Sequence, residues 1–250
     1  MTDRADQYDD PSYDYRQYWK GREYENDAEE VAIRRLLGHD HFTRAIDVGG
    51  GFGRLSKLMT EFADSVLLAE PSRQQLDKAA EYLGDDPRVE RRCLQAAALE
   101  ETTGSADLVL CVRVMHHIPQ PDAAFAEIAR VLQPGGTFVL EFANSANALR
   151  RVRLAVKGKR VPLEPINLRS HLPQTDAEIP FVNHNPRTML QQLDRAGFTL
   201  EQRLSGSNLR SARLKKWLPA RTLLGVERLT QPLLAPLWFG PSIWLKLRRR

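Results

Sequence analysis

The stretch that decides the fold is Arg44-Ala45-Ile46-Asp47-Val48-Gly49-Gly50-Gly51-Phe52-Gly53. An apolar strand over Arg44–Val48 runs into three glycines, and a helical pattern follows from about Gly53 to Phe62. Glycines let the backbone bend sharply and let a ligand approach without a Cβ in the way. The free N–H groups of a helix N-terminus add a positive end. The sequence therefore predicts a ligand-binding turn between a strand and a helix.

The spacing of these glycines argues against a dinucleotide site. The dinucleotide fingerprint is G-x-G-x-x-G, but after Gly49 and Gly51 the third position is Arg54. Asp47, inside the loop, also suits a cationic ligand that carries an amino acid better than it suits a pyrophosphate. A Rossmann oxidoreductase of the NAD type is therefore the weaker alternative, and it stays open at this point.

Outward from the loop, apolar strand runs alternate with helical patterns. Strands are predicted at 44–48, 65–70, 88–94, 106–112, 137–142, 198–204 and 241–247, and helices at 53–62, 72–83, 122–132 and 186–197. This alternation is typical of an α/β fold in which a mostly parallel, doubly wound sheet is covered on both faces. Such sheets bind ligands beyond the carboxyl ends of their strands.

The N-terminal region differs from this pattern. Residues 1–14 are acidic and have no apolar period, so we expect a disordered tail. A dense aromatic and basic segment follows over Tyr15–Tyr24. Asn26 is a candidate N-cap for a helix that ends near Gly38.

Composition narrows the class of protein. The chain has 250 residues and only two cysteines, so a disulfide framework is not expected and a reducing cytoplasm is. The acidic N-terminus does not resemble a secretory signal, and no apolar run is long enough for a membrane span. Residues 1–125 carry 15 Lys and Arg against 24 Asp and Glu, whereas residues 126–250 carry 21 against 8. A basic C-terminal half can attract nucleic acid, an anionic substrate or a lipid surface, or can simply be a solvated face.

A second acid supports the glycine loop as a binding site. Glu70 ends the strand predicted at 65–70 and stands 23 positions after Asp47. In nucleotide-binding sheets, an acid at this place accepts hydrogen bonds from ribose hydroxyls. The two acids together indicate a ligand that carries a ribose.

The segments AIDVGGGFG, LLAEPS and ADLVLCVRVMHHIPQPDAAFAEIARVLQPGGTFVLEF resemble the class I S-adenosylmethionine-dependent methyltransferases of the methyltransferase-11 type, which include ubiquinone- and menaquinone-biosynthesis-like enzymes. The resemblance covers roughly residues 15–145. It implies a seven-stranded, mostly parallel Rossmann-like sheet with an N-terminal lid over 15–43 and an S-adenosylmethionine-binding core over 44–145. Residues 146–250 would then form an acceptor-side cap and the last sheet strands.

The resemblance also implies which residues hold the cofactor. The expected cofactor-binding residues are Asp47, Gly49, Gly50, Gly51, Phe52, Glu70, Pro71, Gln95, Ala96, Arg113, Tyr18 and Arg22. Gln95 departs from the family, which usually has an acid where the adenine amino group is met; its amide oxygen can still accept that hydrogen bond. From the lid, Arg22 would meet the methionine carboxylate, and Tyr18, Trp19 or Tyr24 would shield the sulfonium. Alternatively, these aromatic residues pack the N-terminal helix onto the body.

Two histidines follow the fourth strand. His116 or His117 could act as a general base, since histidine titrates near neutral pH; alternatively, one could cap the turn before Pro119 and the other pack. Arg113 could face an anionic substrate or pair with a nearby acid. The histidines lack metal-ligand spacing, so no metal site is expected.

The acceptor is expected to be a small molecule methylated on oxygen or carbon. The segment after the fourth strand, Arg113–His116, lacks the Asn/Asp-Pro-Pro-aromatic motif that accompanies amino methylation, so nitrogen is disfavoured. Weak candidates for the acceptor pocket are His171, Asn183, His184 and Asn185. The basic, leucine-rich segment 209–239 could contact a membrane surface and admit a lipophilic acceptor.

Two further alternatives stay open. An RNA-directed role would rest on the basic half and the Arg248–Arg250 tail, but no nucleic-acid-binding motif accompanies them. A non-catalytic S-adenosylmethionine-binding partner of another enzyme is opposed, though not eliminated, by the intact cofactor loop.

Overall fold

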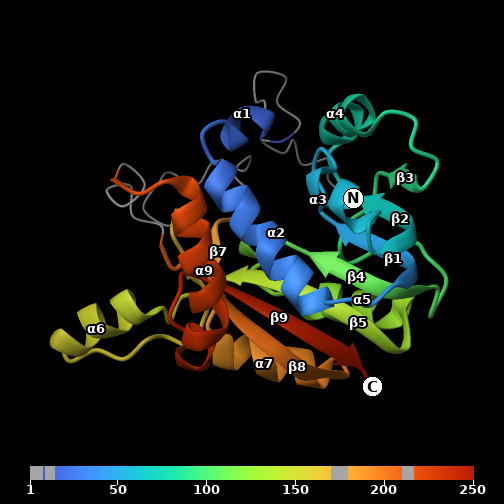
Figure 1. Cartoon of the computed structure of the whole chain (residues 1–250). Coiled ribbons are helices and arrows are strands. Elements are labelled where there is room, and N and C mark those ends of the chain that lie inside the picture. Colours follow the sequence, from blue (N-terminus) through green and yellow to red (C-terminus); the bar gives the residue numbers. More distant parts are fainter. Residues whose placement is uncertain (1–7, 9–14, 170–179, 210–216) are drawn as a thin grey trace.

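The computed structural model describes residues 8, 15–169, 180–209 and 217–250 (Figure 1). A twisted central sheet has helices on both faces, and the C-terminal strand ends at one edge of the layered body. The strands are β1 (Phe42–Val48), β2 (Ala63–Ala69), β3 (Val89–Arg92), β4 (Ala106–Cys111), β5 (Leu132–Ala143), β8 (Phe198–Gly206) and β9 (Ser242–Arg249), with a small separate pair β6 (Ile166–Asn167) and β7 (Val182–Asn183). The helices are α1 (Tyr15–Trp19), α2 (Glu23–Leu37), α3 (Arg54–Met59), α4 (Arg73–Leu83), α5 (Asp122–Val131), α6 (Ala148–Val156), α7 (Pro186–Arg195) and α9 (Ala220–Leu234), with short 3-10 helices η2 (Met115–His117) and η3 (Ala235–Leu237).

The seven-stranded sheet has the order β3-β2-β1-β4-β5-β9-β8. β1 pairs in parallel with both β2 and β4, and β4 pairs in parallel with β5. β9 is inserted antiparallel between β5 and β8. The strand order reverses beside β1, which places the glycine loop at the switch point where such sheets bind ligands.

Alternate residues of the central strands feed two cores. Ile46 and Val48 of β1 belong to the core under α5 and α7, while Ala45 belongs to the core under α2 and α3. Because successive side chains of a strand point to opposite faces, this near-continuous apolar run is what a sheet buried on both faces requires. The predicted α/β, doubly wound, mostly parallel seven-stranded sheet is confirmed.

Two local expectations differ from the structure. Asn26 is not an N-cap, because α2 begins at Glu23 and Asn26 lies inside it; its side-chain amide donates to Glu30 one turn later. β5 begins at Leu132, before the Pro-Gly-Gly segment, because Leu132 pairs with Ala106 ahead of a register shift in the β4–β5 ladder. In contrast, Ser72 caps α4 by accepting from the Gln75 N–H, as its N-cap position predicts.

Some predictions fall on residues that the structure does not describe. The expected tail over 1–14 lies outside the described residues except for Tyr8, and the division at 43 and 145 into lid, core and cap stays a prediction. Among the helices described, none is both long and apolar enough to cross a bilayer.

Candidate functional site

The glycine loop leaves β1 in a left-handed backbone shape that favours glycine. Gly49 has φ +68°, and a Cβ there would lie 2.3 Å from Cγ2 of Val114. Gly53 has φ +84°, and its Cβ would lie 2.6 Å from Cδ1 of Leu83. Both positions combine a left-handed φ with a close approach, so any larger residue would be strained and would clash. The loop is therefore a fixed, narrow cradle.

Asp47 lies beneath this cradle. Its side chain is 2% exposed and accepts a hydrogen bond of 2.7 Å from the Ser56 hydroxyl. Burial raises the pKa of the Asp47 carboxyl to about 6, against the lowering effects of Ser56 and Arg54. A ligand cation near this carboxyl would offset the desolvation of its charged form.

Glu70 stands at the rim of the same loop. One carboxylate oxygen accepts from the Gly51 N–H at 2.9 Å, and the other accepts from the Ser72 N–H at 3.0 Å. The carboxylate therefore ties the turn after β2 to the glycine loop after β1. Two main-chain donors fix its position, and this is the place in nucleotide-binding sheets where an acid accepts from ribose hydroxyls.

The segment after β3 reaches the same edge. The Leu94 N–H donates to the Glu70 carbonyl at 3.3 Å, and the turn that follows is closed by an Ala98 N–H to Gln95 carbonyl bond of 2.9 Å. Gln95 is exposed and Ala96 is half-buried. Pro71, also exposed, accepts from the Cys93 thiol with its carbonyl. These predicted adenine-side residues thus lie next to Glu70 in the fold.

An aromatic layer covers the loop. Tyr15 lies 3.6 Å from where a Gly51 Cβ would be, and its ring stacks on Tyr18 with centroids 5.6 Å apart. Phe52 is buried between Tyr15 and Tyr82, with edge contacts of 6.1 and 5.3 Å between centroids. The N-terminal helix α1 therefore packs across the glycine loop, where the sequence predicted a lid.

Arg113 projects from the end of β4 toward this lid. It is a non-glycine residue with φ +62°, and its N–H donates to buried Glu141 of β5 at 3.0 Å. Its guanidinium donates to the Tyr18 hydroxyl at 2.6 Å and pairs with Glu29 at 3.3 Å. Arg113 thus pairs with an acid in the structure, while its contact with an anionic substrate or the cofactor stays a prediction.

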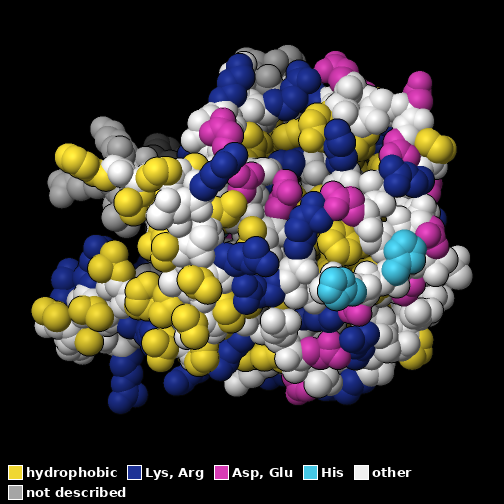
Figure 2. Space-filling model, in the orientation of Figure 1, with side chains coloured by type: hydrophobic (Ala, Val, Ile, Leu, Met, Phe, Trp, Pro, Cys, Tyr) yellow, Lys and Arg dark blue, Asp and Glu magenta, His cyan; other side chains and the backbone are white. Residues whose placement is uncertain are grey.

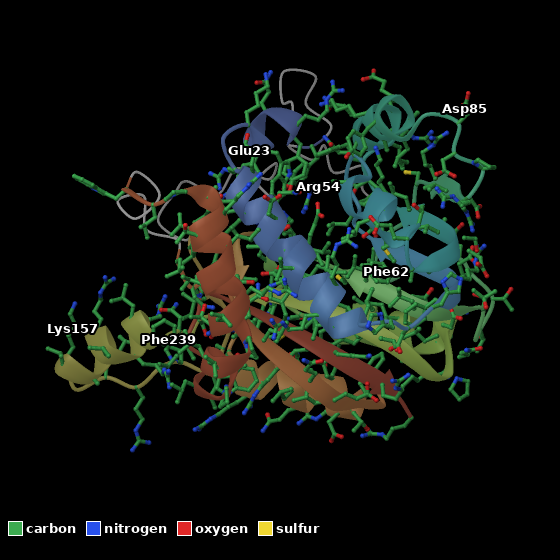
Figure 3. All side chains as sticks on the ribbon, in the orientation of Figure 1. Glu23, Arg54, Phe62, Asp85, Lys157 and Phe239 are labelled. Carbon is green, nitrogen blue, oxygen red and sulfur yellow. The ribbon has the colours of Figure 1, made fainter. Side chains whose placement is uncertain are left out.

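Glu29 joins two arginines to the lid. It pairs at 2.5 Å with Arg54 of α3, which is labelled in Figure 3, and it also pairs with Arg113. Arg54 lies over the Trp19 ring, 4.0 Å from its centroid. We call Glu29, Arg54, Arg113, Tyr18 and Trp19 the Glu29 cluster; it connects α1 and α2 to the loops after β1 and β4.

Arg22 takes part at the edge of this cluster. Its guanidinium lies 4.0 Å above the Tyr18 ring and donates to its hydroxyl at 3.0 Å. A contact with a methionine carboxylate stays a prediction.

The two histidines of η2 have different surroundings. His116 packs on Phe181, with centroids 4.6 Å apart, and burial lowers its pKa to about 2. His117 meets the Pro180 carbonyl with Nδ1 at 3.1 Å and the Tyr8 hydroxyl with Nε2 at 3.0 Å. Burial lowers the pKa of His117 to about 4. A carbonyl can only accept, so Nδ1 of neutral His117 donates and Nε2 is the acceptor.

The weak acceptor candidates have structural contacts. His184 is buried and bonds the Met115 carbonyl through Nε2 at 2.8 Å, and Asn185 caps α7 by accepting from the Arg187 N–H. Asn183 lies on β7 and is half-buried, whereas His171 lies outside the described residues. Within the described ranges, no group of acidic, histidine and cysteine side chains could hold a metal ion.

Sequence reasoning missed three residues at this site. Glu29 and Tyr8 reach it across long separations in the chain, 84 residues in the Arg113 pair and 109 in the His117 contact, and no local spacing signals such partners. Glu141 did carry a signal, since it is a charged residue inside the otherwise apolar run of β5.

Comparison with known proteins agrees with this geometry. Residues 46–140 match the family model described as a methyltransferase domain, Methyltransf_11. A ubiquinone biosynthesis O-methyltransferase of Methylococcus capsulatus is 29% identical over 130 residues, which are 51% of this chain and 54% of that protein. The chain thus matches about half the length of this curated relative.

Solved structures share the fold over nearly the whole chain. An S-adenosylmethionine-dependent methyltransferase from Mesorhizobium loti superposes with a TM-score of 0.62 at 22% identity, covering 89% of this chain and 98% of that one. The [4+2]-cyclase SpnF superposes with a TM-score of 0.58 at 18% identity, covering 89% and 81%. At these identities the likeness shows the fold alone, and the cyclase illustrates that one fold hosts different chemistry.

Three observations indicate the same class of fold. They are the family match over residues 46–140, the strand order of the sheet, and the placement of Asp47 and Glu70 on the glycine loop. Residues 46–140 therefore resemble the methyltransferase domain Methyltransf_11, and the chain has the fold of the S-adenosylmethionine-dependent methyltransferases of solved structure.

Proposed function

We propose that this protein transfers the methyl group of S-adenosylmethionine to a hydroxyl oxygen of a small-molecule acceptor. The observation that carries the donor assignment is the joint placement of Asp47 beneath and Glu70 beside one glycine loop. The second candidate reaction is methylation of a carbon atom of the acceptor.

The residues present fit the donor. Gly49, where a Cβ would strike Val114, lets the loop turn tightly after β1 and hold its place between the acids. Asp47 supplies a buried negative charge for the ligand's cationic part, and Glu70 supplies a fixed acceptor for ribose hydroxyls. Gln95 and Ala96, next to Glu70 through Leu94, would receive the adenine.

Oxygen is favoured on the acceptor side by the contact between Tyr8 and His117. A phenol hydroxyl lies 3.0 Å from Nε2 of His117, with the two rings edge to face at 5.6 Å between centroids. The same nitrogen can take the proton of an acceptor hydroxyl that replaces Tyr8. His116 is held against Phe181, so we assign the base role to His117 alone. The relative from Methylococcus capsulatus bears the name of an O-methyltransferase.

The mechanism asks little acid–base work of the protein. S-adenosylmethionine supplies a sulfonium methyl that is already activated for attack. The chain's task is to hold the acceptor oxygen in line at about 3 Å and to exclude water. The aromatic layer of Tyr15 and Tyr18 over the loop excludes water, and the Glu29 cluster fixes that layer in place.

The test is transfer of an isotope-labelled methyl group. The chain is incubated with methyl-¹³C S-adenosylmethionine and, in separate reactions, a panel of phenols and other hydroxyl compounds, a small-molecule extract or total RNA. Products are read by mass spectrometry. Labelled ethers formed by wild type and lost in Glu70→Gln support the proposal. Labelled carbon–methyl products would move the acceptor atom to carbon, and label in RNA would overturn the small-molecule assignment.

A further inference from the structure

The helix α6 exposes an apolar stripe that packs against nothing in the described fold. Leu149, Val152 and Val156 are 69, 63 and 83% exposed, and no residue of α6 is buried. Their spacing of three and four residues puts them on one face of the helix. In Figure 1, α6 extends away from the body of the molecule.

A second stripe lies on α9 and η3. Leu223, Glu227 and Gln231 form the buried face of α9, and Gln231 donates to the Ala28 carbonyl of α2 at 3.0 Å. The opposite face of α9, continued by η3, is exposed to solvent. Its exposed apolar residues are Val226, Leu229, Leu233 and Leu237, which are 39, 65, 72 and 55% exposed.

The two stripes are parts of one surface, which we call the α6–α9 face. The Ala148 N–H donates to the Phe239 carbonyl at 3.0 Å, and Arg151 donates to the Leu237 carbonyl at 2.6 Å. Figure 2 shows hydrophobic side chains gathered over this part of the molecule with Lys and Arg beside them. Phe239 lies where α6 joins the body, and Lys157 lies at its far end (Figure 3).

The charge along α6 and the residues that follow it directly is positive. Between residues 147 and 163 the chain has six cations and no acid. The cations are Arg150, Arg151, Arg153, Lys157, Lys159 and Arg160. An exposed apolar stripe with a cationic border fits the boundary between anionic headgroups and acyl chains.

We propose that the α6–α9 face binds the surface of an anionic lipid bilayer. A second copy of the chain fits this face less well, because a two-fold interface would set the same cationic border against itself. The sequence predicted membrane contact within residues 209–239. The proposed surface uses only the outward face of α9 and η3 from that segment, and it adds α6.

This surface also adjoins the candidate site. α6 starts at Ala148, five residues after β5 ends at Ala143, and β5 is parallel to β4, so α6 follows the same sheet edge as Arg113 and the histidines. If the proposed methyl transfer holds, a lipophilic acceptor could enter from the bilayer directly into that edge. Lipid binding itself does not depend on the methyl transfer.

The test is co-sedimentation of the full chain with vesicles of phosphatidylcholine alone or with 30% phosphatidylglycerol (about a third anionic lipid, enough to set a negative surface). We expect binding to the anionic vesicles and little binding to phosphatidylcholine. The triple variant Leu149→Asp, Val152→Asp, Val156→Asp should weaken binding by about tenfold or more, since it removes the apolar stripe and opposes the headgroup charge. These side chains are exposed, so the fold should tolerate the change.

A charge-matched control separates the face from net charge. Ala123→Asp, Ala126→Asp and Gln133→Asp add the same three charges at exposed positions on α5 and the start of β5, and this variant should bind vesicles like wild type. Calorimetry with S-adenosylmethionine in solution should give the same affinity for all three proteins. Lack of vesicle binding by wild type, equal loss in both variants, or an α6-dependent dimer that does not bind vesicles would overturn the proposal. Vesicle binding without S-adenosylmethionine binding would instead refute the proposed function alone.

Discussion

Replacing Glu70 by Gln tests the donor site at a single oxygen. The two carboxylate oxygens accept from the Gly51 and Ser72 N–H groups, both buried with the side chain. An amide has one oxygen and one NH₂ group, so one main-chain donor loses its acceptor and faces another donor.

The size of the effect follows from these contacts. Hydrogen bonds to a charged acceptor contribute about 1.5–3 kcal/mol, against about 0.5–1.5 kcal/mol for neutral pairs. Weakening two ribose contacts by about 1 kcal/mol each and misplacing the loop should cost about 2–3 kcal/mol, which is roughly thirty- to hundredfold in affinity.

The assay is isothermal calorimetry with S-adenosylmethionine, beside thermal unfolding of each protein. The matched control is Glu164→Gln, which removes one negative charge at an exposed position. We expect the control to bind like wild type. If Glu70→Gln is folded and its affinity for S-adenosylmethionine is within twofold of wild type, Glu70 does not hold the methyl donor.

Three further predictions follow from the site. The pKa of Asp47 is raised from 3.8 to about 6 in the folded state, so its contribution to stability is complete below pH 3.8 and is lost as the pH rises through 6. Asp47→Asn should therefore remove about 3 kcal/mol from the pH dependence of the unfolding free energy, measured with denaturant. An unchanged pH profile in this variant would contradict the prediction. Because a cationic donor prefers ionised Asp47, its affinity in wild type should rise between pH 5 and 7 by calorimetry, and the rise should vanish in Asp47→Asn. Glu29→Gln should loosen α1 and the start of α2 by about 1–3 kcal/mol, read as faster hydrogen exchange there. Glu164→Gln, an exposed acid outside these helices, is the control; equal exchange in both variants would show that the Glu29 cluster does not hold the lid.

The base assignment predicts a difference between neighbouring histidines. His117→Gln should lower kcat on a hydroxyl acceptor by about a hundredfold or more, with little change in donor affinity, whereas His116→Gln should act mainly through stability. Since the pKa of His117 is about 4, the rate of wild type should be flat above about pH 5. If the rate instead titrates near pH 7 and this titration disappears in His117→Gln, the pKa of His117 during catalysis is near 7 and not about 4.

The sheet was predictable because its signals are local. The run Ala45–Val48 is apolar at every position but Asp47, and Ser72 precedes α4 with the right side chain for a cap. Boundaries were less certain where long-range pairing decides them, as where Leu132 joins β4 before the Pro-Gly-Gly segment. Asn26 illustrates the same limit, since an asparagine favours a cap but can also face outward inside a helix.

The site residues also fall into those with a local sequence signal and those placed by long-range contacts. Asp47 lies near the end of β1 and Glu70 directly follows β2. Because these two strands pair in parallel, sequence spacing was enough to predict that the two acids meet. The Glu29 cluster and the contact between Tyr8 and His117 join segments far apart in the chain, and their chemistry emerges only when α1 and α2 fold over the sheet edge.

The central claim is that Asp47–Gly53 with Glu70 forms a site for S-adenosylmethionine. Calorimetry of the purified chain against S-adenosylmethionine, S-adenosylhomocysteine and NAD tests it most directly. We expect the first two to bind with similar stoichiometry and NAD not to compete. Preference for NAD, or no binding of either adenosyl compound, would contradict it.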